Sequence, residues 1–294
     1  MFSTVLFLRV GYVVGNAGFL QTSIIFGISY IILGATVLSI CAIATNGAVE
    51  GGGVYFMLSR TMGPEFGGSI GSLFYLANIA GSALNVVACT EGIISNFGPM
   101  GTFFQILPDG RWWKVLYSTV LNVLNLILCL IGAELFGKVS LLILISVMCC
   151  TVGVGSSFFL DNTVLSQYNE TDNNVTTLVN GTFIGLAANT LSGISELWKS
   201  NFDGTYQQDC SDPNAPVDFF TVFGVVFSGV TGVMAGANLS GELKSPASSI
   251  PLGTLSACLL TFITFIVLAL LTTLTCDKAL LLNDCLYMTS GCRI

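Results

Sequence analysis

The chain of 294 residues contains no histidine, and only 9% of its residues are charged. Histidine is the most common general base and a common zinc ligand, and no Cys-x-x-Cys pair replaces it, so we expect no structural zinc site. The sequence also has no Gly-x-x-x-x-Gly-Lys-[Ser/Thr] phosphate-binding loop and no nucleophile paired with a base. These absences argue against an enzyme, an ATP-driven pump and a protein that depends on a cofactor.

Basic residues are scarce as well: 9 Lys and Arg stand against 16 Asp and Glu, for a net charge of −7. A nucleic-acid partner would need a basic face, so we exclude one. Hydrophobic residues make up 53% of the chain, and the mean hydropathy is +0.83. Soluble domains usually carry about 25% charged residues. The lipid bilayer is therefore the main solvent of this chain.

Seven apolar runs approach or exceed the roughly 20 residues that cross the hydrocarbon core of a bilayer. They lie at about 1–18, 20–44, 69–96, 112–133, 137–159, 218–241 and 252–275. The sequence thus predicts an all-α polytopic membrane protein. Because the first run begins at Met1 without a polar leader, we also expect that sequence is missing before Met1 and after Ile294.

The longest polar stretch, 160–216, contains three Asn-x-[Ser/Thr] acceptors for N-glycosylation, at Asn169, Asn174 and Asn180. Such a cluster indicates an extracellular or lumenal loop, which places the N-terminus in the cytosol. We expect the plasma membrane, with an endomembrane as the alternative. Four cysteines fall in predicted outer loops, where disulfides are allowed and the pairing stays open: Cys210, Cys276, Cys285 and Cys292.

The run from Phe227 to Pro251 is apolar but interrupted by glycine at 229, 232, 236 and 241. Inside a membrane, unwound backbone persists only where it is buried in protein or lines a cavity. Where it does persist, the freed amides and carbonyls can bind ions. The run therefore predicts a broken transmembrane helix with an ion site at the break.

Between the second and third runs, residues 41–71 read CAIATNGAVEGGGVYFMLSRTMGPEFGGSIG, which is too glycine-rich to predict a helix and too apolar to predict a free linker. This segment resembles the cation-chloride cotransporter family, as do VLFLRVGYVVGNAG at 5–18 and TGVMAGANLSGELKSPASSIPLGT at 231–254. The likeness covers nearly the whole chain and is strongest to the branch called cation-chloride cotransporter-interacting protein. It implies a LeuT-like fold of two inverted repeats, of which 1–294 would be a partial amino acid permease-like domain with about seven of twelve helices.

The resemblance also implies where ions would bind. In the family, backbone amides at the breaks of the first and sixth helices hold chloride, and here those amides belong to Ser3, Thr4, Val5, Gly232, Val233 and Met234. Of the cation ligands of potassium-chloride transporters, Thr231 is present, while Asn85 replaces a tyrosine and Ser228 a proline. Both replacements still offer oxygen ligands. The alternative is that Asn85 and Ser228 form ordinary hydrogen bonds between helices.

Two charges, Arg9 and Glu91, fall inside predicted spans, each six residues outward from a site residue, Ser3 or Asn85. At 1.5 Å per residue both would lie about 9 Å from the site. Because an intramembrane charge is costly, we expect an Arg9–Glu91 ion pair, the outer gate that the family resemblance implies. The alternative is that Arg9 extends alone to the membrane surface.

These features favour a secondary transporter that moves chloride together with a monovalent cation, potassium or ammonium, by alternating access. Two alternatives stay open: a non-transporting partner that regulates true cotransporters, and an amino-acid or polyamine permease of the same superfamily. Expected partners are the two ions, the bilayer, and a second copy or another cation-chloride cotransporter. We expect no cofactor.

Overall fold

The structure is a computed structural model, and it describes residues 2–45, 53–98, 107–108, 110–131, 133–159, 163–172, 175–186, 191–206, 217–238 and 245–283. Within these described residues, five helices are long and apolar enough to cross a membrane. They are α1 (Thr4–Thr45), α3 (Pro64–Phe97), α4 (Arg111–Ile131), α5 (Ala133–Ser157) and α9 (Pro246–Thr275). A helix pairs its backbone groups internally, as hydrocarbon requires. The chain is an integral, multi-pass membrane protein.

The first two predicted spans are both contained in α1, which bends at Gly18. Gly18 has φ 68° and ψ 168°, so the helix breaks there and the chain reverses. The sixth predicted span is formed by α7 (Phe219–Val230) and the short helix α8 (Met234–Asn238). Each of the seven predicted runs therefore corresponds to helix in the structure.

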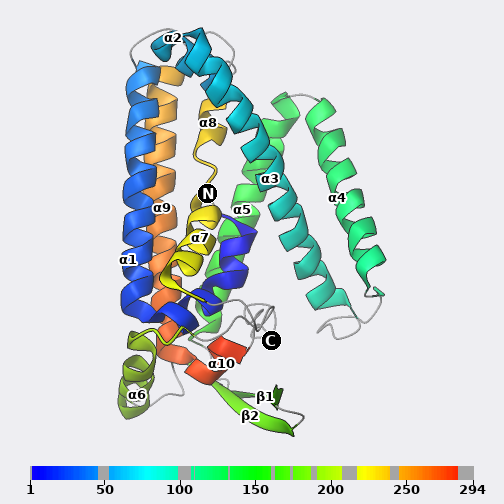
Figure 1. Cartoon of the computed structure of the whole chain (residues 1–294), viewed down its shortest axis with the longest axis vertical. Coiled ribbons are helices and arrows are strands. Elements are labelled where there is room, and N and C mark those ends of the chain that lie inside the picture. Colours follow the sequence, from blue (N-terminus) through cyan, green and yellow to red (C-terminus); the bar gives the residue numbers. More distant parts are fainter. Residues whose placement is uncertain are drawn as a thin grey trace.

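The elements outside the spans gather at the two ends of the helical bundle (Figure 1). The turn at Gly18, helices α6 (Leu191–Phe202) and α10 (Lys278–Asn283), and the strands lie at one end. Helix α2 (Gly53–Met62) and α8 lie toward the other. The described parts of the predicted outer loop, the two strands and α6, therefore lie at the end opposite α2.

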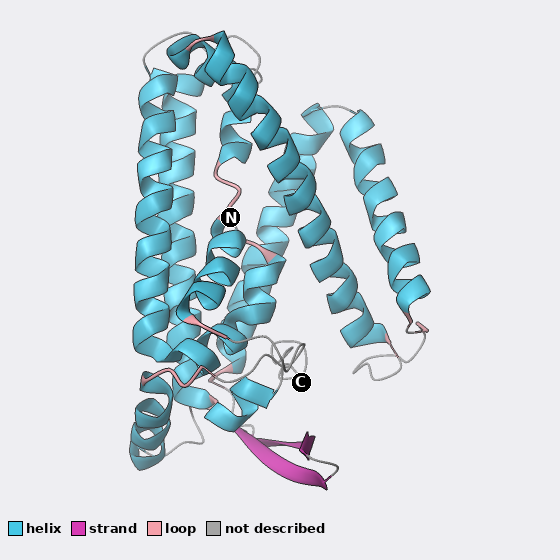
Figure 2. Cartoon of the chain, in the orientation of Figure 1, coloured by secondary structure: helices cyan, strands magenta, loops and turns pink. Residues whose placement is uncertain are grey.

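A β-hairpin stands out from the bundle within that loop (Figure 2). Strands β1 (Thr163–Asp172) and β2 (Val175–Ile184) pair antiparallel, from Thr163 opposite Ile184 to Asp172 opposite Val175. The all-α prediction did not include this hairpin. Two of the predicted glycosylation acceptors, Asn169 and Asn180, are strand residues, and Asn174 lies outside the described residues.

The glycine-rich segment after α1 corrects one prediction, because residues 53–62 form helix α2 and α3 begins at Pro64 rather than at 69. Gly63, with φ 96°, separates the two helices. The next glycines allow these helices to pack closely. A Cβ at Gly67 would come within 2.7 Å of Ser59, and one at Gly71 within 2.7 Å of the Tyr55 ring. Glycine here serves close packing, which composition alone cannot distinguish from a loop.

The main core lies where α1 packs along α9 and against α7. Phe26 of α1 stacks on Phe265 of α9 with ring centroids 6.0 Å apart, and the Tyr30 hydroxyl donates to Thr261 at 3.0 Å. In contrast, the apolar side chains of α4 and α5 are largely exposed, as expected of surfaces that face lipid or further protein.

The turn at Gly18 is held against the end of α6. A Cβ on Gly18 would come within 2.5 Å of the Asp203 carbonyl carbon and 2.7 Å of the Gly204 nitrogen. The N–H of Thr205 donates to the Asn16 carbonyl at 3.0 Å, and Tyr206 is hydrogen-bonded to Gln21. These contacts fix the direction in which the two halves of α1 leave the turn.

A second close approach joins α1 to α7. A Cβ on Gly229 would lie 2.9 Å from the Cβ of Leu6 and 3.2 Å from its Cδ1. Leu6 is fully buried, and Gly229 is buried as well. The first turn of α1 therefore packs directly against the last turn of α7, with no room for a side chain between them.

We predict that Gly18→Ala destabilises the protein by about 1–3 kcal/mol, because it forces an L side chain into a left-handed conformation against backbone that cannot move aside. Gly27→Ala is the matched control, since Gly27 lies in the same helix with nothing within 4 Å of its Cβ position. Thermal unfolding followed by fluorescence-detected size-exclusion chromatography measures the difference. Equal melting temperatures for the two variants would contradict this role of the turn.

Gly229→Ala is predicted to cost a similar amount, about 1–3 kcal/mol, by overpacking the contact with Leu6. Gly224→Ala is its control, because Gly224 is also in α7 and has nothing within 4 Å. The same unfolding assay applies to both variants. Equal melting temperatures for Gly229→Ala and Gly224→Ala would contradict the close contact between α1 and α7.

Candidate functional site

Helix α7 ends at Val230, in the middle of the sixth predicted span, and the helix resumes at Met234. Thr231 is extended, with φ −63° and ψ 170°, and Gly232 has φ 106°. A positive φ of this size favours glycine, which explains why the break falls at this residue. The interruption predicted from the glycine pattern is confirmed.

The break exposes backbone groups that a continuous helix would pair. The hydroxyl of Thr231 donates to the Ser228 carbonyl at 2.7 Å, and the Ser228 hydroxyl donates to the Val225 carbonyl at 2.8 Å. Two of the three expected cation ligands, Ser228 and Thr231, are thus in direct contact. Gly232 is exposed while Val233 is buried, so the turn presents its backbone on one side and packs on the other.

The other predicted anion-binding backbone lies at the start of α1. The Ser3 carbonyl accepts from the N–H groups of Leu6 at 3.1 Å and Phe7 at 3.3 Å, so Ser3 stands at the N-terminal cap of the helix. Donors in the first turn of a helix have no partner within it, and the helix dipole favours an anion there. The amides of Ser3, Thr4 and Val5 belong to this first turn.

The contact between Leu6 and Gly229 brings these two interrupted backbones to the same level of the bundle. In Figure 1 the N-terminus accordingly lies beside the connection between α7 and α8. On the far side of the break, α2 packs on α8, since a Cβ at Gly53 would come within 3.1 Å of the Asn238 Cα. The two segments that are expected to bind chloride, more than two hundred residues apart in sequence, therefore lie close to each other.

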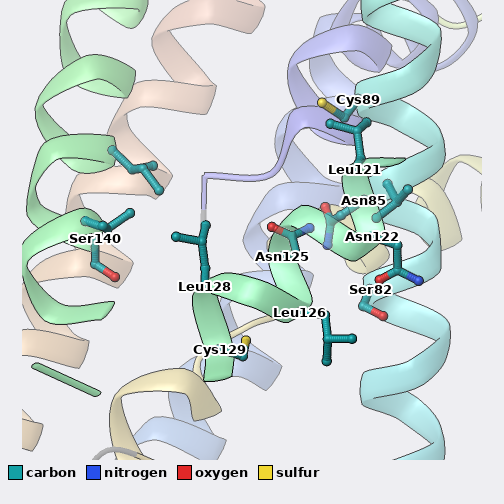
Figure 3. Close-up of a pocket in the computed structure, with 13 residues that line it drawn as sticks. Ser82, Asn85, Cys89, Leu121, Asn122, Asn125, Leu126, Leu128, Cys129 and Ser140 are labelled. Atoms are coloured by element: carbon teal, nitrogen blue, oxygen red, sulfur yellow. The ribbon is translucent and has the colours of Figure 1, made fainter. Parts of the chain in front are cut away.

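Asn85, the third expected cation ligand, lies in a different place. It lines a cavity of about 640 Å³ whose described lining residues all belong to α3, α4 and α5 (Figure 3). Its amide nitrogen donates to the Gly81 carbonyl of its own helix at 2.9 Å. The structure thus groups Asn85 with residues of α4 and α5, and groups Ser228 with Thr231.

The expected gate residues are both half-buried, Arg9 on α1 and Glu91 on α3, two helices that contact each other. No ion pair between these two side chains is seen in the part of the chain that the structure describes. The gate therefore stays a prediction.

Two residues of the cavity around Asn85, Asn122 and Asn125, were not singled out from the sequence. They stand three residues apart in LNVLN, on the otherwise apolar helix α4. Residues at this spacing share one helix face. Two amides on one face of a transmembrane helix are the signal that could have found them, because such groups are costly in hydrocarbon.

Comparison with known proteins places this arrangement in a family. Residues 1–291 match the family model described as Amino acid permease. The chain is 45% identical over 293 residues to Solute carrier family 12 member 9 of Danio rerio, covering 97% of this chain and 31% of that protein. Identity to the Homo sapiens protein of the same name is 42% over 294 residues, with the same two coverages.

A bumetanide-sensitive sodium-(potassium)-chloride cotransporter of Manduca sexta is 33% identical over 270 residues, which are 92% of this chain and 23% of that protein. The chain thus spans about a third or less of the length of these relatives, which are transporters rather than enzymes. The chain belongs to the amino acid permease family, with the LeuT-like fold of that family, and along 97% of its length it is similar to proteins of solute carrier family 12.

Proposed function

We propose that the full-length protein carries chloride together with a monovalent cation across a membrane by alternating access. The observation that carries this proposal is the meeting of two interrupted backbones, the start of α1 and the α7–α8 break, in contact through Leu6 and Gly229. In transporters of this architecture, broken helices supply ion ligands near the bilayer midplane.

Chloride suits the amide side of this junction. The first turn of α1 and the turn from Gly232 to Met234 both offer N–H groups without a formal charge. Backbone amides and helix dipoles stabilise a monovalent anion, and the neutral site leaves the ion free to depart, which a carrier requires. A lysine or arginine at this place would hold chloride more permanently.

The cation would bind on the carbonyl side of the same break. The Ser228 carbonyl and the Thr231 hydroxyl oxygen are 2.7 Å apart, and each retains a lone pair after their mutual hydrogen bond. Neutral oxygens of this kind suit an alkali cation or ammonium. Relatives named as cation-chloride cotransporters, including Vacuolar cation-chloride cotransporter 1 of Saccharomyces cerevisiae at 32% identity, support the pairing of the two ions.

A second candidate function, a non-transporting partner of other cotransporters, is favoured by the placement of Asn85. This residue occupies the position of a cation ligand in the family resemblance, yet it lines the cavity between α3, α4 and α5. A protein that has lost part of its cation site could keep the fold and act through association. We also propose an Arg9–Glu91 gate, a location in the plasma membrane or an endomembrane, and glycosylation of the outer loop. Each of these is compatible with both candidate functions.

Uptake of radioactive rubidium, a potassium surrogate, distinguishes the two. We expect cells that express the full-length protein to take up rubidium only when chloride is present, and Thr231→Ala to reduce this uptake roughly tenfold, since one oxygen ligand to a charged group is removed. Thr221→Ala, which changes an exposed threonine one helix length away on α7, should leave uptake unchanged. Absence of uptake by protein that reaches the membrane, verified by surface labelling or organelle fractionation, would reject transport in favour of the partner function.

A further inference from the structure

A lysine joins the end of α6 to the start of α10. The Lys278 ammonium, in the first turn of α10, donates to the carbonyls of Ser200 at 3.0 Å and Asp203 at 2.8 Å. Ser200 lies in the last turn of α6 and Asp203 follows that helix, where carbonyls have no partner within the helix. A positive charge there also complements the helix dipole. Lys278 therefore fastens α10 to the end of α6.

An asparagine in the same turn of α6 joins it to α9. Asn201 is fully buried, and its amide nitrogen donates to the carbonyls of Thr273 at 3.0 Å and Cys276 at 2.8 Å, at the C-terminal end of α9. Its own carbonyl oxygen is buried and has no hydrogen-bond partner among the described residues. Because an unpaired buried acceptor is costly, the two donated bonds must offset that cost. The end of α6 is thus fixed to two elements at once.

The reversal of α1 lies between the two elements that Lys278 joins. On one side, Gly18 packs against the backbone of Asp203. On the other side, a Cβ at Gly15 would come within 2.9 Å of the Cβ of Leu281, a buried residue of α10. Helices α6 and α10 both lie at this end of the bundle (Figure 1). The contacts form a closed ring: the α1 turn, the end of α6, Lys278, and α10 back to the α1 turn.

This ring acts on the far end of the first α1 segment. The segment runs from Ser3 to Gly18, which is about 22 Å at 1.5 Å per residue. A change of about 5° in its direction at the turn would move the far end by about 2 Å over that length. Hydrogen-bond distances vary by only a few tenths of an ångström, so a displacement of this size would spoil the placement of the amides there.

We propose that Lys278 and Asn201 are positioning residues for the chloride site. By closing the ring they set the direction in which the first segment of α1 leaves its turn, and so they place the amides in the first turn of that helix. Neither residue touches the ion. The inference rests on the proposed function for the anion at the start of α1, whereas the ring itself rests on contacts between described residues.

Hydrogen exchange and the binding of radioactive chloride, measured on the same purified full-length protein, test the two parts separately. The N–H groups of Thr205 and Tyr206 donate to the Asn16 carbonyl at 3.0 Å and 3.2 Å, so their exchange reports whether the end of α6 still holds the α1 turn. We expect Lys278→Met to speed their exchange roughly tenfold and to weaken chloride binding roughly threefold to tenfold, the usual size of coupling between distant sites.

Three further variants sharpen the test. Asn201→Leu removes the two bonds to α9 and should change both readouts in the same direction. Lys278→Arg keeps the charge and the donors, so it should restore both, which shows that the loss in Lys278→Met is not a failure to fold. Lys199→Met is the matched control, because Lys199 is an exposed lysine in the last turn of α6. It should behave as the parent protein does.

Unchanged exchange at Thr205 and Tyr206 in both Lys278→Met and Asn201→Leu would show that the turn holds without the ring. Faster exchange with unchanged chloride affinity would limit the ring to stabilising the turn and reject the positioning role. Equal losses in Lys199→Met would also reject it. A parent protein that binds no chloride would overturn the proposed function and the positioning role together, while the exchange rates would still show whether the ring holds the turn.

Discussion

A transmembrane helix that ends inside hydrocarbon leaves N–H and C=O groups without water or a helical partner, and α7 ends in that way. The groups freed between Val230 and Met234 must therefore be enclosed by protein or satisfied by a ligand. The structure encloses them on one side, where Val233 is buried, and leaves Thr231 and Gly232 exposed on the other. The proposed ion site is the exposed side of this junction.

Two glycines set the geometry of the junction: Gly229 lies beside the break, and Gly18 lies at the far end of the first segment of α1. At Gly229 the missing side chain lets Leu6 approach, so the first turn of α1 reaches the break. At Gly18, on the other end of the same helical segment, the positive φ and the backbone of Asp203 and Gly204 fix the turn into the next span. The α1 segment between these two contacts is therefore positioned at both of its ends, by backbone packing rather than by charge.

The spans and the break can be predicted from the sequence because both depend on local properties. Runs of apolar residues specify helices in lipid, and the Thr231–Gly232 interruption needs a residue that tolerates a positive φ. The sequence prediction was wrong where a glycine makes room for a neighbouring helix. Gly67 and Gly71 were predicted to lie in a loop, but they allow α3 to pack on α2. The β1–β2 hairpin was not predicted either, because strand pairing in a polar loop depends on a partner that the local pattern does not reveal.

The candidate site residues also fall into two groups, one that is local in sequence and one that only tertiary structure brings together. Ser228 and Thr231 are neighbours in sequence and meet in the structure. Asn85 joins Asn122 and Asn125 only because the Thr90–Ser118 hydrogen bond aligns two helices, which is a tertiary property. Two polar levels therefore exist near the centre of the membrane domain, one made chiefly of backbone at the α7–α8 break and one made of side-chain amides between α3 and α4.

The claim on which the rest depends is that the two interrupted backbones form one anion site. A high-resolution electron cryomicroscopy structure of the full-length protein in chloride, compared with one in gluconate, tests it directly. We predict density between the first turn of α1 and Gly232 to Met234 in chloride only, with Leu6 still packed on Gly229. Identical maps in the two anions, with these amides hydrogen-bonded to protein carbonyls, would contradict it.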